Sequence, residues 1–226
     1  MSRKILFVTA TSAEAAILKK IDGVTPADKF YIFNGTEIHL LISGVGSVST
    51  AWSLKQWLSV NEKPDLVLNA GIAGSYRDTI KIGDVVMPVT DCFADSGIED
   101  GENFLTLFES GLADPDEFPY RSGLLHSDAY MSDLVKNILS PVNAITVNTA
   151  TGSEKSIFKL VKKFNPDIET MEGATFFYIC IREKLPFLAI RSISNMVEPR
   201  NRSKWNIPLA LEHLSEKLKE VIIRLE

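Results

Sequence analysis

The stretch Leu66-Val67-Leu68-Asn69-Ala70-Gly71-Ile72-Ala73-Gly74 decides the fold of this chain. It begins with large apolar residues and continues directly into small ones, which indicates a buried strand at residues 66–68 that leads into a loop. Ligands of open α/β sheets bind beyond the carboxyl ends of the strands. The loop is therefore a candidate binding site, and a turn with a purely structural role stays an open alternative.

Similar apolar runs lie on both sides of this stretch. They predict strands at residues 5–8, 38–42, 85–89, 144–147 and 187–190. Helices are predicted from Thr11 or Ser12 to Leu18, at residues 48–60, 153–164 and 173–183, and in the C-terminal segment, where apolar residues recur at steps of three and four up to Leu225. The alternation of strands and helices, without a repeat or a linker, predicts a single α/β domain over residues 1–226.

The composition excludes several classes of protein. The net charge is -5, which argues against a nucleic-acid binder because such a protein needs a basic face. Two cysteines, Cys92 and Cys180, do not make a disulfide scaffold and favour a reducing compartment. The apolar run after Met1 is too short for a signal peptide or a membrane span. We expect a soluble, cytoplasmic protein without a membrane partner.

An acidic segment stands apart from the rest of the chain. Residues 82–120 contain ten acidic residues and no Lys or Arg. Its centre, residues 95–119, is interpreted as a long excursion from the sheet, which is either functional or a solvated acidic loop.

Several chemistries find no support in the sequence. The three histidines, His39, His126 and His213, lack partners at metal-ligand spacing, so no metal site is expected. No P-loop and no Gly-x-Ser-x-Gly elbow is present. The Gly44-Val45-Gly46 turn lacks the third glycine of a dinucleotide fingerprint. It is either a simple tight turn or a point where a small ligand approaches the backbone closely.

Three polar residues near apolar runs are candidates for chemistry. Glu14 lies about one turn into the first predicted helix. The alternative to a functional role is an exposed glutamate that interacts favourably with the positive end of the helix dipole. Glu172 leads into a very apolar segment, and a buried carboxylate needs partners. It could equally be an ordinary acid at a helix N-terminus. Asn195 follows the strand at residues 187–190. The alternative to a functional role is that it only forms a turn after this strand.

Taken together, these elements resemble the nucleoside phosphorylase/hydrolase family and, within it, the nucleosidase branch. The resemblance spans roughly residues 5–225. It is carried by Glu14, Ser43-Gly44-Val45-Gly46, Asn69-Ala70-Gly71-Ile72-Ala73-Gly74, Lys81-Ile82-Gly83-Asp84-Val85-Val86, Met171-Glu172-Gly173-Ala174 and Arg191-Ser192-Ile193-Ser194-Asn195. It implies a three-layer α/β fold with a central mixed sheet flanked by helices.

The resemblance also implies roles for the acids. Glu14 matches the family's acid that activates the attacking water, and Glu172 matches the acid that holds the ribose hydroxyls, with Met171 packed against the sugar. Both roles suit the cleavage of an N-glycosidic bond, because the ribose becomes an oxocarbenium cation and water needs a base. The arginines that hold phosphate in the family's phosphorylases are missing, so water is the expected nucleophile and no cofactor is expected.

Asn195 replaces the aspartate of the adenine-specific nucleosidases. An amide cannot protonate N7 of the purine, but its NH₂ group can donate to N7 and to a 6-oxo group. The resemblance therefore implies a 6-oxopurine nucleoside as substrate. Within the branch, residues 147–152 and 194–200 are most similar to the futalosine hydrolases, which release hypoxanthine from futalosine in a route to menaquinone.

Further contacts to the substrate are implied by the same resemblance. The further substrate-binding residues are Val45, Ala70, Gly71, Ile72, Asn148, Thr149 and Ala150. Phe93 is expected to stack on the base or to close the site, and Trp205 to cover the 5′ group. Arg200, with Arg202 nearby, could meet a carboxylate on the 5′ tail, although an exposed arginine pair is the alternative. Family members assemble as homodimers or larger homo-oligomers.

Two other functions stay open. The first is a nucleosidase that acts on methylthioadenosine or adenosylhomocysteine, which Asn195 disfavours. The second is a nucleoside-binding protein without turnover. The presence of both Glu14 and Glu172 disfavours it, because binding alone requires no acid that activates water.

Overall fold

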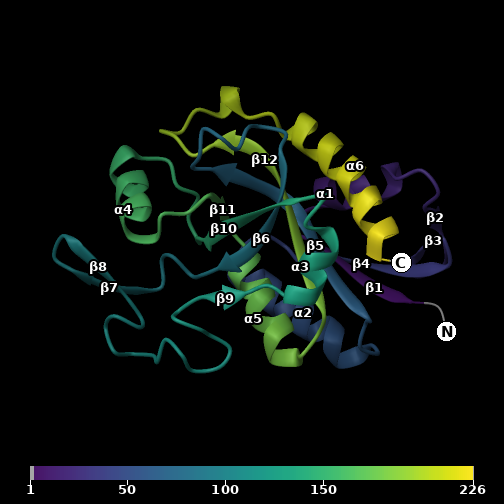
Figure 1. The fold of residues 1–226 in the computed structure, drawn as a ribbon, viewed down its shortest axis with the longest axis horizontal. Coiled ribbons are helices and arrows are strands. Elements are labelled where there is room, and N and C mark those ends of the chain that lie inside the picture. The colour runs from purple at the N-terminus through teal and green to yellow at the C-terminus, as the bar shows by residue number, and fades with distance from the viewer. Residues whose placement is uncertain (1–2, 226) are drawn as a thin grey trace.

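The computed structural model describes residues 3–225 and consists of a large mixed β-sheet with helices on both faces (Figure 1). The strands are β1 (Lys4–Thr9), β2 (Thr25–Pro26), β3 (Tyr31–Phe33), β4 (Thr36–Ile42), β5 (Leu66–Ser75), β6 (Val85–Asp91), β7 (Gly97–Asp100), β8 (Asn103–Thr106), β9 (Leu125–His126), β10 (Ser140–Thr146), β11 (Ile168–Thr170) and β12 (Phe187–Met196). The helices are α1 (Ser12–Ala15), α2 (Ser47–Val60), α3 (Ala129–Val135), α4 (Glu154–Phe164), α5 (Gly173–Glu183) and α6 (Ile207–Leu225), with 3-10 turns at Ala16–Lys20 and Arg202–Lys204.

Strand β5 lies at the centre of the sheet, whose order is β11-β10-β6-β12-β5-β1-β4-β3-β2. It pairs in parallel with β1 and β12 and in antiparallel fashion with β11. Because β11 also pairs with β10, the strands β5, β12, β6, β10 and β11 form a closed ring of pairings. The predicted end of this strand at Leu68 was wrong, since pairing continues to Ser75. The small residues after Leu68 stay in the sheet because β12 pairs with them as far as Ser75 and β11 joins on the other side at Gly74 and Ser75.

The core has two halves, one on each face of the sheet. Along β1, Ile5 and Phe7 pack against the side that carries α3 and α6, whereas Leu6 and Val8 pack against α2 and α5. Alternate side chains of a strand point to opposite faces, so a continuous apolar run is what a sheet covered on both faces requires. The predicted α/β fold with a central mixed sheet is confirmed.

Most of the predicted elements are present. The strands expected at residues 5–8, 38–42, 85–89, 144–147 and 187–190 correspond to β1, β4, β6, β10 and β12, and four of the expected helices to α2, α4, α5 and α6. The first helix is shorter than predicted, because α1 becomes a 3-10 turn at Ala16. None of the helices within residues 3–225 has the length and apolar character needed to cross a bilayer.

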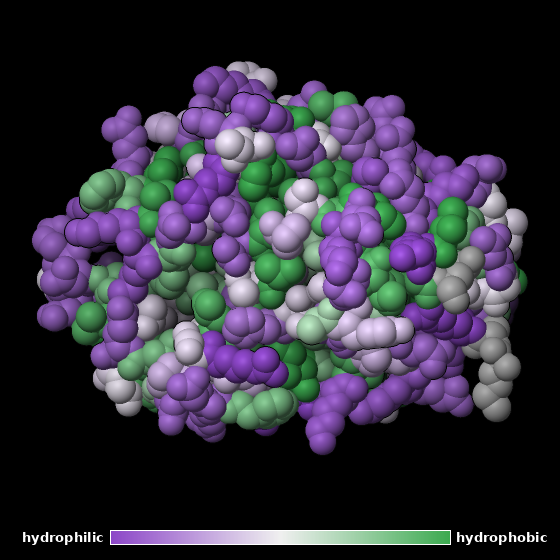
Figure 2. Space-filling view, in the orientation of Figure 1, coloured by the Kyte–Doolittle hydropathy of each residue, from purple (hydrophilic) through white to green (hydrophobic). Residues whose placement is uncertain are grey.

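The acidic segment contains a small hairpin of its own. Strands β7 and β8 pair only with each other and extend from the end of the molecule opposite β2 and β3 (Figure 1). Hydrophilic side chains, including the exposed Glu99, Asp100 and Glu102, dominate that end (Figure 2). The interpretation of residues 95–119 as an excursion from the main sheet is confirmed.

Candidate active site

Glu14 is held at the carboxyl end of β1 by the turn that starts α1. Thr11 is the N-cap of α1 and forms a capping box with Glu14: its hydroxyl accepts from the Glu14 N–H, and Glu14 Oε2 accepts from the Thr11 N–H at 2.9 Å. Glu14 Oε2 also accepts from the Ala10 N–H and the Thr11 hydroxyl. The side chain is only 6% exposed, so the alternative of an exposed helix glutamate is wrong.

The small residues of β5 let this carboxylate reach the backbone. Glu14 Oε1 accepts from the Ile72 N–H at 3.1 Å, and a Cβ at position 71 would lie 2.8 Å from the same oxygen. Only glycine fits at Gly71 without displacing Glu14. Since a carboxylate oxygen accepts two hydrogen bonds readily and Oε1 has one, Oε1 can still take a hydrogen bond from water.

Glu172 approaches from the N-terminus of α5. Its Oε1 accepts from the N–H of Gly46 at 2.9 Å. Gly46 has a φ of 88°, which glycine adopts without strain, and the Gly-x-Gly turn therefore presents a backbone donor to Glu172. Burial raises the pKa of Glu172. The Gly46 N–H and the charge of Arg191 oppose this shift, whereas the charge of Glu14 adds to it. Glu14 and Glu172 are therefore close enough for the charge of one to affect the pKa of the other.

A buried arginine, Arg191 of β12, lies among these acids. Its Nη1 donates to the backbone oxygens of Asn69 and Ile190, and its Nη2 donates to Asn69 Oδ1. The charges of Glu172, Glu14 and Asp91 all favour its charged form, against the effect of burial. No role for Arg191 was predicted from the sequence. A charged residue inside the apolar run 187–193 is the signal that could have revealed it, because a buried charge requires partners.

A third acid, Asp91 at the end of β6, was also missed. It has no exposed surface. Its Oδ1 accepts from the Thr146 hydroxyl at 3.0 Å, and its Oδ2 has no hydrogen-bond partner among residues 3–225. Burial raises its pKa to about 7, against the opposing effects of Thr146 and Arg191. A Cβ at Gly173 would collide with Oδ2, so the glycine at the start of α5 makes room for this carboxyl group.

The amide of Asn195 has a defined orientation. Its Nδ2 donates to the backbone oxygen of Met196 at 3.0 Å, and its Oδ1 accepts from the Ser194 hydroxyl at 2.8 Å. A carbonyl can only accept, so the NH₂ group must face Met196. One N–H of the amide is left for another acceptor. Asn195 lies within β12 rather than after a strand, and it is half-buried beside Gly74.

The loop at residues 148–152 borders a cavity of about 630 Å³. Thr149 and Ala150 line it together with Asp95, and α4 and the β7–β8 hairpin enclose it further. Asn148 is exposed, and its backbone and side-chain N–H groups donate to Asp95. The loop is therefore attached to the start of the acidic segment.

The other predicted contact residues occupy different environments. Arg200 lies over the ring of Trp205 at 5.7 Å, and its backbone N–H donates to Gly152. Phe93 and Met171 are half-buried, and Val45 is 53% exposed. Ala70 lies in the core with no exposed surface, on the face of the sheet that α6 covers. Its role as a substrate contact stays a prediction.

Comparison with known proteins identifies the family. The sequence profile of the phosphorylase superfamily matches residues 4–225, and the chain belongs to this superfamily. A futalosine hydrolase of Acidothermus cellulolyticus is 30% identical over 95% of this chain and 88% of its own. A 5'-methylthioadenosine/S-adenosylhomocysteine nucleosidase of Buchnera aphidicola is 28% identical over 92% of this chain and 86% of its own.

Solved structures share the fold. The futalosine hydrolase of Helicobacter pylori superposes with a TM-score of 0.80 at 19% identity, covering 99% of this chain and 98% of its own. The 5'-methylthioadenosine/S-adenosylhomocysteine nucleosidase of Neisseria meningitidis, in complex with methylthio-immucillin-A, gives 0.80 at 18% identity, covering 97% and 98%. The family and these relatives identify the chain as an enzyme that acts as a nucleosidase.

Proposed function

We propose that this chain is a futalosine hydrolase, which cleaves the N-glycosidic bond of futalosine with water and releases hypoxanthine. The observation that carries the proposal is the amide at Asn195, whose oxygen is engaged by Ser194 and whose remaining N–H is a hydrogen-bond donor. N7 and the 6-oxo group of hypoxanthine are both acceptors, so a donor at this position matches a 6-oxopurine.

Glu14 acts as the base in the proposed mechanism. Three donors engage its Oε2, whereas Oε1 has one, from Ile72. A water molecule that donates to Oε1 would be positioned beside the backbone of β5, and its proton would pass to Glu14 as its oxygen attacks the anomeric carbon. The base leaves with the electron pair of the broken C–N bond and takes its proton from solvent water, because Asn195 has none to give. General-base assistance of this kind contributes roughly 10²–10⁴ to the rate.

Glu172 acts on the sugar. Its carboxylate accepts hydrogen bonds from the ribose hydroxyls and stabilises the positive charge that develops on the ring as the bond to the base breaks. The Gly46 N–H holds one of its oxygens and supports the ionised form. Arg191 balances part of the negative charge of both acids when no substrate is bound.

Futalosine carries a benzoate group on its 5′ tail, and we propose that Arg200 and Trp205 recognise this tail. Arg200 and Trp205 are stacked, so they offer an aromatic surface and a cation at one place. A carboxylate on an aromatic ring can meet both groups, with the guanidinium as a bidentate donor.

A 5'-methylthioadenosine/S-adenosylhomocysteine nucleosidase is the second candidate, because curated relatives of comparable identity carry that name. Adenine presents a 6-amino donor rather than an acceptor. N7 accepts in both purines, but an N–H of Asn195 that is directed at the 6-position would meet another donor in adenine, which leaves both groups unpaired.

The experiment is an assay with three substrates. The purified protein is incubated with futalosine, inosine and methylthioadenosine, and free base is separated by chromatography. Hypoxanthine released from futalosine, with little from inosine, supports the proposal. Adenine from methylthioadenosine supports the second candidate, and tight binding without release of any base contradicts both.

We also propose that the enzyme works as a homo-oligomer through the exposed apolar face of α2. Val48 and Trp52 are 82% and 70% exposed, and Val48 also lines a cavity of about 600 Å³ between α2 and α5. Exposed apolar groups of this size commonly mark contacts between subunits. A Trp52→Glu variant is expected to lower the molar mass measured by light scattering, and an unchanged mass would contradict this assignment.

A further inference from the structure

The carboxylate of Glu169 is buried outside the set of acids around Arg191. It lies on β11 and is 8% exposed. Its Oε1 accepts from the Thr151 N–H at 2.9 Å, and its Oε2 accepts from the Thr151 hydroxyl and from the Tyr76 hydroxyl at 2.7 Å. Both hydrogen-bond donors of Thr151, its N–H and its hydroxyl, therefore donate to the carboxylate of Glu169. Hydrogen bonds to a charged group are stronger than neutral ones.

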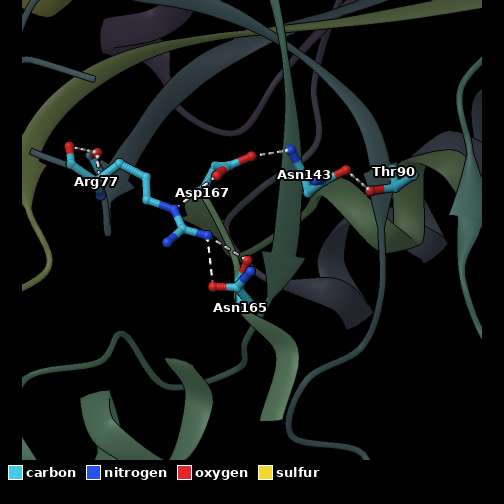
Figure 3. A network of polar contacts seen from close by, with 6 residues as sticks. Arg77, Thr90, Asn143, Asn165 and Asp167 are labelled. Carbon is cyan, nitrogen blue, oxygen red and sulfur yellow. Dashed lines mark hydrogen bonds and ion pairs between the residues drawn. The ribbon is translucent and has the colours of Figure 1, made fainter. Parts of the chain in front are cut away.

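Tyr76 keeps Glu169 in place, and a separate polar network lies beside it on the neighbouring strands. Burial, and next the charge of Glu169, raise the pKa of Tyr76, so its hydroxyl remains a donor at neutral pH. Figure 3 shows Arg77, just beyond β5, reaching Asp167 and Asn165, while Asp167 accepts from the N–H of Asn143 on β10. These contacts join the end of β5, the middle of β10 and the start of β11, two residues before Glu169.

Glu169 is also in register with the residue that is proposed to recognise the base. In the sheet, Gly74 of β5 pairs with Glu169 on one side and with Asn195 on the other. Residues paired across neighbouring strands point to the same face of the sheet. A Cβ at Gly74 would lie 2.9 Å from a methyl of Val197 and 3.2 Å from Asn195 Nδ2, so Glu169 and Asn195 are paired on either side of a position that only glycine can occupy.

We propose that Glu169 is a positioning residue for nucleobase recognition, which holds the loop at residues 148–152 against the sheet at a set distance from Asn195. The inference rests on the proposed function, in which Asn195 and this loop contact the base. Thr149 and Ala150 precede the attachment point at Thr151, and the backbone of Gly152 accepts from Arg200 just after it. Loss of the carboxylate frees the loop and weakens binding of the base without touching the groups that break the bond.

The test compares Glu169→Ala with two changes at the loop, Thr151→Val and Thr151→Ser. Steady-state kinetics are measured with whichever purine nucleoside the wild type hydrolyses best. Glu169→Ala is expected to raise KM roughly tenfold or more and Thr151→Val about threefold, with kcat within about threefold of wild type. Thr151→Ser keeps both donors and is expected to retain the wild-type KM. The Thr151 variants keep the test valid if Glu169→Ala does not fold.

Asp167→Asn is the matched control, because it changes an acid of the same segment that binds Arg77 and not the loop. It is expected to lower the melting temperature without raising KM. A wild-type KM in Glu169→Ala and Thr151→Val, a loss confined to kcat, or an equal rise in KM in Asp167→Asn would overturn the inference. If the wild type hydrolyses no nucleoside, the proposed function fails; the Kd of free hypoxanthine, measured by calorimetry, then tests Glu169 separately with the same expected ratios.

Discussion

Replacing Asp91 by asparagine should change how the stability of the protein depends on pH. The buried carboxyl group has a pKa of about 7, compared with an ordinary value of 3.8. The native state therefore keeps a proton that the unfolded chain releases above about pH 4. Stability that comes from this proton is fully present below the ordinary pKa and is lost as the pH rises through about 7.

The size of the effect follows from the two pKa values. A difference of about 3 pH units corresponds to about 4 kcal/mol over the whole range, at about 1.4 kcal/mol per unit. Between pH 5 and pH 8 the linkage relation gives a loss of roughly 2.5 kcal/mol for this group alone. Asparagine carries no proton to lose. Its NH₂ group would occupy the place of Oδ2, which has no partner among residues 3–225, and this costs about 1–3 kcal/mol at every pH.

Urea unfolding at pH 5, 6, 7 and 8 measures the free energy of unfolding of both proteins. Asp91→Asn should be less stable than wild type at pH 5, and the gap should close or reverse by pH 8, a relative change of roughly 2.5 kcal/mol. Acids that do not interact with Asp91 are common to both proteins and cancel in the difference, whereas the charge of Glu172 is one of the causes of the raised pKa of Asp91. Asp133→Asn, at an exposed aspartate, controls for the general effect of removing a charge. A difference between Asp91→Asn and wild type that stays constant across this range would refute the reasoning.

Three further changes test other parts of the site. Glu14→Gln should lower kcat by about 10²–10⁴ because the amide cannot take a proton from water; steady-state hydrolysis measures it, and an unchanged kcat contradicts the role of the base. Arg191→Met should destabilise the protein by about 3–5 kcal/mol at pH 8 and by less at pH 5, where the acids can neutralise themselves; equal losses in urea at both pH values would count against charge balance. Arg200→Ala should raise KM for futalosine but not for inosine, and an equal rise for both would remove the tail contact.

The sheet could be predicted from the sequence because its central strands are continuous apolar runs. Residues 5–8 and 187–190 are examples, and each is buried on both sides. The length of β5 could not be predicted, because the small residues from Gly71 onward remain in the sheet through pairing with strands that come much later in the chain. Short elements such as α3 and β11 carry too few residues for a periodic signal.

The candidate site could be predicted only in part, for a related reason. Glu14 and Glu172 belong to recognisable motifs, whereas Asp91 and Arg191 are single polar residues at the ends or in the middle of apolar strands. Their importance comes from burial and from the charges that face them, contributed by segments far apart in the chain. Glu169 was missed for the same reason, since its partners Tyr76 and Thr151 come from other segments.

The choice of purine depends on the amide at position 195, and exchanging it for the corresponding acid tests this directly. Wild type and Asn195→Asp are each assayed with futalosine and with methylthioadenosine, and the ratio of the two kcat/KM values is compared between the proteins. An aspartate there can hold a proton for N7 and accept from a 6-amino group, so the ratio should move toward the adenine nucleoside by at least about tenfold. An unchanged ratio, or a shift further toward futalosine, would contradict the account.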